Sequence, residues 1–144
     1  MESTQILLPT DFSENAKKAM HYAIYIFEKI KCTFHILNAF QTSSSGLEST
    51  RSKARGTRLF RAVKEESERN MARIVNEFNA KNKNTLHSFE GHSVSDSLVN
   101  AIRHTANNRD IQSIFMGTKG SSAVKEVFMC RSPIQVLQNI DFTP

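Results

Sequence analysis

The sequence has no tryptophan, and its 144 residues include only two cysteines, three prolines and five glycines. Cys32 and Cys130 are too few and too far apart in the chain to predict a disulfide framework or a metal knuckle, so we expect both to be reduced. No apolar run approaches the roughly 18 residues that a membrane span requires, and the start of the chain lacks a signal-peptide pattern. These absences argue against disulfide-stapled and membrane proteins and predict a soluble, cytoplasmic protein.

What the chain does contain is ordinary for one globular domain. The apolar fraction is 39% and the charged fraction is 23%, and ten phenylalanines carry most of the aromatic packing. A chain of this length can bury about two thirds of its unfolded surface in a single core. We therefore expect residues 1–144 to form one domain that needs no metal or disulfide to fold.

The formal charge of +5 comes largely from one basic segment, residues 51–73. A basic stripe attracts nucleic acid or another polyanion, because phosphate neutralisation supplies most non-specific binding. Glu65, Glu66 and Glu68 interrupt this stripe. The pattern therefore favours a solvated helix face over a nucleic-acid-binding surface.

Hydrophobic periodicity alternates along the chain between strand-like runs and helical stripes. Asp11 or Ser13 can cap the first helix, Gly91 is expected to end the third strand, and Ser93 or Ser95 to cap the third helix. A polar, serine-rich segment at 41–56 is predicted to be a mobile loop. The pattern predicts strands at 5–8, 33–40, 85–90 and 111–116, and helices at 14–30, 57–78, 94–105, 121–128 and 133–138.

This order predicts an α/β domain with an open parallel sheet, Rossmann-like, covered by helices on both faces. Two strand-to-helix turns, at 9–13 and 116–120, should then lie side by side where parallel sheets bind ligands. Gly117 and Gly120 let the second turn approach a phosphate closely. No strand is predicted after the last helix, so either a terminal edge strand is missing or the chain is the first part of a longer one.

The residues around both turns resemble the universal stress protein family. The run Ile6-Leu7-Leu8-Pro9-Thr10-Asp11-Phe12-Ser13-Glu14-Asn15-Ala16 is similar to that family's opening strand and loop. Gly91, the run Ile114-Phe115-Met116-Gly117-Thr118-Lys119-Gly120 and the later Val124-Lys125-Glu126 are similar to its second half. The resemblance implies a five-stranded parallel sheet with a nucleotide-binding crevice, a role in stress survival, and a partner that is either a second copy in a homodimer or a second domain of the same type.

The resemblance also implies a site for ATP or a related adenine nucleotide; separately, we predict no metal. The family motif runs Gly, two residues, Gly, nine residues, Gly, then Ser or Thr, and here Cys130 and Arg131 occupy its last two positions. A Cβ at Cys130 obstructs close approach to phosphate, whereas Arg131 offers a bidentate phosphate contact and Ser132 restores the hydroxyl if the turn shifts by one residue. By family matching, Asp11 faces the adenine or ribose, Ala39 lies beside the adenine, and the glycines border the phosphates. The full set of predicted nucleotide-binding residues is Pro9, Thr10, Asp11, Ala39, Met116, Gly117, Gly120, Arg131 and Ser132.

Simpler interpretations stand beside these. Asp11 can serve only as a helix cap and the two glycines only as a turn. None of the five histidines, His21, His35, His87, His92 and His104, lies at metal-ligand spacing or beside a nucleophile. Because Asp11 is the only acidic residue at either turn, we do not expect an enzyme. Three functions remain: a non-catalytic stress-response module, an ATP-dependent switch that closes the 41–56 loop, and a polyanion-binding protein.

Overall fold

The computed structural model describes the backbone of residues 3–41, 50–117 and 127–130, and the side chains of residues 3–41 and 56–116. Its sheet has the strand order β3-β2-β1-β4-β5. Strands β1 to β4 run parallel, and β5 pairs antiparallel with β4 at the edge. The elements are β1 (Thr4–Pro9), α1 (Glu14–Ile26), β2 (Cys32–Phe40), α2 (Thr50–Lys81), β3 (His87–Ser95), α3 (Leu98–Asn108), β4 (Ser113–Gly117) and β5 (Val127–Cys130).

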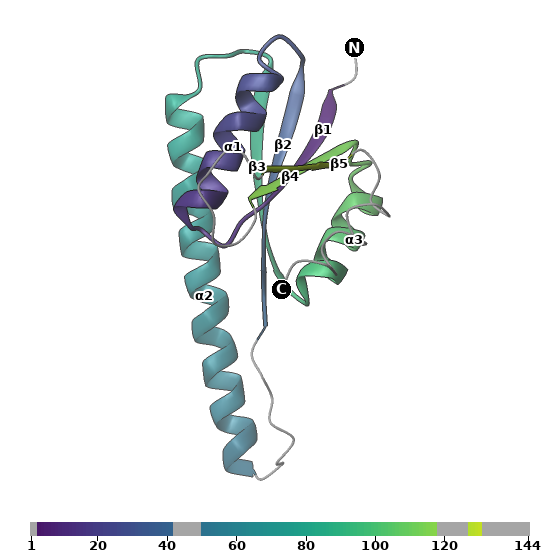
Figure 1. Ribbon diagram of the computed structural model, residues 1–144. Helices are drawn as coiled ribbons and strands as arrows, with labels where there is room; N and C mark the ends of the chain where they lie inside the picture. Colours follow the sequence, from purple (N-terminus) through teal and green to yellow (C-terminus); the bar gives the residue numbers. More distant parts are fainter. Residues whose placement is uncertain (1–2, 42–49, 118–126, 131–144) are drawn as a thin grey trace.

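Helices cover both faces of the sheet, as the sequence predicts: α1 and α2 lie on one face and α3 on the other (Figure 1). The larger core cluster joins α1 and α2 to the sheet, and Phe34 and Met20 in it are almost fully buried. The smaller cluster joins α3 to β1, β2 and β4 through Leu7, Leu37 and Ile102. Each face buries apolar side chains because consecutive strand residues point to opposite sides.

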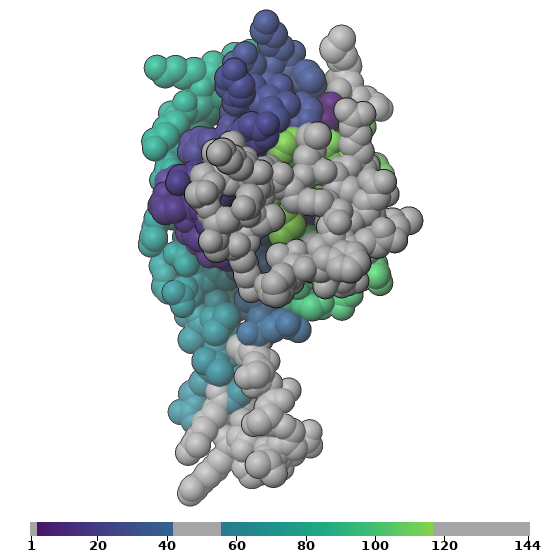
Figure 2. Space-filling model, viewed as in Figure 1, coloured from purple at the N-terminus to yellow at the C-terminus, as the bar shows by residue number. Residues whose placement is uncertain are grey.

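The two helices on one face also contact each other. Figure 2 shows α1 and α2 side by side on the surface of the molecule, where Lys17 of α1 forms an ion pair with Glu77 of α2 at 2.5 Å. Nearby, the rings of His21 and Phe78 lie with their centroids 5.0 Å apart. These contacts fix the two helices relative to each other as well as to the sheet.

Several boundaries differ from the sequence-based predictions. Gly91 does not end the third strand: β3 runs through it to Ser95, and the cap of α3 is Ser97, whose side chain accepts a hydrogen bond from the Asn100 N–H. The two earlier serines are therefore strand residues. Strand β3 continues past Gly91 because its parallel neighbour β2 supplies hydrogen-bonding partners as far as Phe40, which lies opposite Ser95. Likewise α1 ends at Ile26 rather than at residue 30.

The long second helix and the end of the sheet also differ from prediction. Helix α2 begins at Thr50, so residues 50–56 of the predicted loop are helical, and residues 42–49 lie outside the described part. Residues 127–128 were predicted as helix but belong to β5, which pairs with β4 and makes the edge antiparallel. The predicted helix at 133–138 and the predicted absence of a final strand lie outside the described residues.

Gly91 matters because α2 packs directly against it. A Cβ at this position would lie 2.6 Å from Cγ of Met71 and 2.8 Å from Cγ2 of Val75. Distances this short force the helix or its side chains to move. The glycine therefore sets how closely α2 approaches β3.

Replacing Gly91 with alanine is expected to lower the free energy of unfolding by about 1–3 kcal/mol, the usual cost of overpacking a well-packed interior. Urea unfolding of the purified chain, followed by circular dichroism, measures this change. Gly56→Ala is the matched control, since nothing lies within 4 Å of a Cβ there and the residue is in α2. That variant should gain up to about 1 kcal/mol, because alanine is the better helix former. Equal effects at the two sites would contradict this account of Gly91.

Candidate functional site

The carboxyl ends of three parallel strands meet at one edge of the sheet. Strand β1 lies between β2 and β4, with Pro9 opposite Leu37 and Leu7 opposite Ile114. The chain moves from β1 through β2 to β3 and then crosses back to place β4 on the other side of β1. The order therefore reverses between β1 and β4, and ligands of open α/β sheets bind outside the strand carboxyl ends at such a reversal. The two predicted turns thus start from neighbouring strands.

The turn from β1 into α1 is tightly held by its own hydrogen bonds. Thr10 is buried, its N–H donates to the Leu37 carbonyl at 2.8 Å, and its hydroxyl oxygen accepts from the Phe12 N–H at 2.9 Å. Phe12 has a φ of 66°, an uncommon conformation for a residue with a side chain. Asp11 is exposed at the tip, where its carboxylate accepts from the Ser13 N–H at 2.9 Å. Ser13, rather than Asp11, caps α1.

A polar network beneath the turn joins it to β2, β3 and α2. Asn38 of β2 donates from Nδ2 to the Thr10 carbonyl at 2.8 Å. Its Oδ1 accepts from the hydroxyl of Ser67 of α2 at 2.7 Å, and Ser67 also lies 2.9 Å from the hydroxyl of Ser93 in β3. A hydroxyl has one proton, so with Ser67 donating to the amide oxygen, Ser93 donates to Ser67. Asn38 thus positions the turn from below.

The structure brings together the predicted residues that it describes. Pro9, Thr10 and Asp11 lie at the end of β1, Ala39 lies near the end of β2, and Met116 lies near the end of β4. Gly117 ends β4 and pairs with residue 127 of β5. Gly120, Arg131 and Ser132 lie outside the described residues.

Sequence reasoning missed Asn38 as a site residue. The signal was available, because Asn38 interrupts the mostly apolar run from Phe34 to Phe40 near the end of β2. Ser67 gave a similar signal, since it falls in the helical stripe that faces the sheet with Met71 and Phe78 and is 5% exposed. Buried polar groups need hydrogen-bond partners, and Asn38 and Ser67 are partners for each other.

Two of the five histidines meet in the folded chain. Although spacing along the chain gives no ligand set, His35 of β2 and His92 of β3 lie side by side, with Nδ1 of His35 3.0 Å from Nε2 of His92. Glu90 joins them, and a ligand atom from each of the three residues lies within 4.8 Å of the others. Burial lowers the pKa of both imidazoles. A search for metal-ligand spacing along the sequence could not reveal this pair, because its two histidines come from different strands.

Cys32 behaves as the sequence predicts for a structural thiol. It is buried and free, and burial raises the pKa of its thiol to about 11. Thiolate is the reactive form, so this cysteine is a poor nucleophile at neutral pH.

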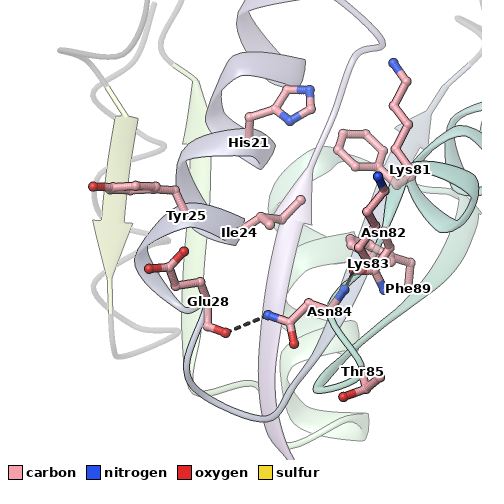
Figure 3. A pocket seen from close by; sticks show the side chains of 11 residues that line it. His21, Ile24, Tyr25, Glu28, Lys81, Asn82, Lys83, Asn84, Thr85 and Phe89 are labelled. Carbon is pink, nitrogen blue, oxygen red and sulfur yellow. Dashed lines mark hydrogen bonds between the residues drawn. The ribbon is translucent and has the colours of Figure 1, made fainter.

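A pocket of about 720 Å³ lies away from the carboxyl edge, where α1 and α2 end and β2 and β3 begin (Figure 3). His21, Ile24 and Tyr25 of α1 line one side of it. The other side includes Asn84, whose Nδ2 donates to the Glu28 carbonyl at 2.6 Å. This pocket shares no residue with the predicted nucleotide-binding set.

Comparisons with known proteins agree with the fold. The model of the universal stress protein family matches residues 2–142. A search of curated proteins found no match. In the part of the chain that the structure describes, no helix is long and apolar enough to cross a membrane.

Solved structures with the same fold have low sequence identity to this chain. The hypothetical protein MJ0577 is 20% identical with a TM-score of 0.66, and the match covers 96% of this chain and 90% of that one. The universal stress protein UspA from Lactobacillus plantarum is 18% identical with a TM-score of 0.62, covering 100% and 94%. A family member from Burkholderia pseudomallei is 15% identical with a TM-score of 0.62, covering 98% and 92%. At these identities the likeness is one of fold.

Proposed function

The chain belongs to the universal stress protein family, and from this premise we propose that it is a non-catalytic module of the stress response that takes an adenine nucleotide at the carboxyl edge of its sheet. In this proposal it acts by association, with a second copy or a second domain of the same type. The observation that carries the proposal is the position of β1 beside β4, where the strand order reverses. Ligands of this class of sheet bind at that point.

Three described residues have a role in this proposal. Asp11 is exposed, and a carboxylate has room for several hydrogen bonds, so it can accept from ribose hydroxyls while it accepts from Ser13. Ala39 offers a small apolar surface beside the adenine. Gly117 ends β4 without a side chain, which lets a phosphate approach the backbone. The proposal assigns no paired acid and base to the turn at 9–13, so we expect the bound nucleotide not to be hydrolysed.

Titration of the full chain with a fluorescent ATP analogue tests the proposal. We expect saturable binding that unlabelled ATP displaces, with no release of inorganic phosphate over the same period. Asp11→Ala should weaken binding by about tenfold or more, because it removes a charge-assisted hydrogen bond to the ribose. The change keeps the buried core intact, since Asp11 is exposed.

Glu28→Gln is the matched control, because this exposed acidic residue lines the pocket at the opposite end of the sheet. The Glu28→Gln variant should bind the ATP analogue with the same affinity as the unchanged chain. Displaceable binding that survives Asp11→Ala undiminished would refute the assignment of this turn. Binding that unlabelled ATP cannot displace would refute the proposal that the ligand is an adenine nucleotide. Light scattering across a concentration series tests association separately.

A further inference from the structure

The His35 and His92 pair has a defined arrangement of protons. Gln5 of β1 donates from Nε2 to the Ser3 carbonyl at 3.1 Å, which directs its Oε1 toward His35. This oxygen can only accept, so His35 Nε2, at 2.6 Å, carries the proton and donates it. A neutral His35 then has its lone pair on Nδ1, where it accepts from the Nε2 proton of His92.

For His35, this is the arrangement that metal-ligating histidines have in proteins. Such a histidine usually donates its second ring N–H to an oxygen, which fixes the tautomer and orients the ligand nitrogen. Gln5 supplies that oxygen, and the two rings stack with centroids 5.2 Å apart. Tetrahedral Zn²⁺ at its usual Zn–N distances holds two nitrogens roughly 3.3–3.4 Å apart. The present separation of 3.0 Å therefore needs to open by only a few tenths of an ångström.

We infer that His35, His92 and Glu90 form a binding site for a divalent transition-metal cation such as Zn²⁺, on the α3 face of the sheet between β2 and β3. The strand register places all three ligand residues on the same face of the sheet, because His35 lies opposite Glu90 and Leu37 lies opposite His92. Residues that are opposite each other in paired strands point to the same side. Two imidazoles and one carboxylate form a recurrent ligand set for zinc, which leaves the fourth position open to water.

The burial of the ligands suits a site that opens to solvent on one side. His35 is 1% exposed, His92 is half-buried, and Glu90 is exposed. On binding, the metal replaces the His92 Nε2 proton, which passes through water to Nδ1 of the same ring, so neutral histidines release no net proton. The carboxylate of Glu90 offsets one positive charge of the cation.

Arg109, the C-cap residue of α3, is a charge that opposes binding. Burial is the largest cause that lowers the pKa of both histidines, and the Arg109 guanidinium lowers it further, whereas the Glu90 carboxylate raises it. The same positive field weakens the attraction for a cation. Removing it should therefore tighten metal binding, an effect that a purely structural histidine pair would not show.

Calorimetric titration of the full chain, free of any histidine tag, with Zn²⁺ tests the site. We expect one equivalent to bind, His92→Gln to weaken binding at least roughly 100-fold, and the exposed Glu90→Gln to weaken it about tenfold. Arg109→Gln should tighten binding about two- to fivefold, the range for a partly screened charge pair. Co²⁺ in place of Zn²⁺ should give the visible absorption of a tetrahedral site, lost in His92→Gln.

His104→Gln is the matched control, because this histidine is exposed on α3 and is not part of the cluster. It should bind Zn²⁺ like the unchanged chain. The site is refuted if the chain binds no stoichiometric Zn²⁺, or if His92→Gln and Glu90→Gln bind as tightly as His104→Gln. Neither result bears on the nucleotide proposal, whose residues are separate from these three.

Discussion

Replacing Phe34 with alanine is expected to lower the free energy of unfolding by about 3–5 kcal/mol, the range for deleting a fully buried phenylalanine. Phe34 is 0% exposed in β2, which has strands on both sides. Its ring stacks on Phe89 at a centroid distance of 5.3 Å and forms a T-shaped contact with His87 at a centroid distance of 4.9 Å. Removing it therefore loses both aromatic contacts and leaves a cavity between the sheet and its helices. Urea unfolding followed by circular dichroism measures the loss.

A loss of this size is a large part of a typical total stability of 5–15 kcal/mol. Leu59→Ala is the control, since this leucine of α2 is 52% exposed and should change the free energy of unfolding by no more than about 0.5 kcal/mol. A Phe34→Ala variant whose free energy of unfolding lies within about 1 kcal/mol of that of the unchanged chain would show that the core does not depend on this ring.

Asn38→Ala is expected to destabilise the chain by about 1–3 kcal/mol and to weaken nucleotide binding as well. The variant leaves the Thr10 carbonyl without its amide donor and the Ser67 hydroxyl without its acceptor. Buried polar groups that lose one partner keep their desolvation penalty, which sets the size of the effect. The turn that carries Asp11 then loses its support from β2. Urea unfolding and the ATP-analogue titration measure the two effects.

A double-mutant cycle with Ser67→Ala separates the network from the individual side chains. Because the two residues share a hydrogen bond at 2.7 Å, we expect a coupling energy of about 0.5–3 kcal/mol. Asn79→Ala, an exposed asparagine on α2, is the control and should be nearly neutral. Strict additivity of Asn38→Ala and Ser67→Ala would mean that the network does not act as a unit.

Much of the fold could be predicted because local pattern and global architecture agree. The apolar run around Leu7 and the glycine at 117 mark two strand ends, and the alternation of strands and helices predicts that they meet in a parallel sheet. The predicted residues Thr10, Asp11 and Ala39 do lie at the expected edge. Predictions failed where a neighbouring strand decided the outcome, as at Gly91 and at residues 127–128. Edge pairing depends on what lies beside a segment, which its own residues do not encode.

The sequence alone determined the family, the parallel α/β architecture and the turn at Asp11, because these depend on local periodicity and on residues close together in the chain. Only the tertiary structure decided which distant polar groups meet. Asn38 reaches Ser67 because α2 packs on the sheet beside β2. His35 reaches His92 through the register of β2 with β3, and a shift of one residue would turn His92 to the opposite face. That register is a property of packed strands, so the polar network and the candidate metal site appear only in the folded chain.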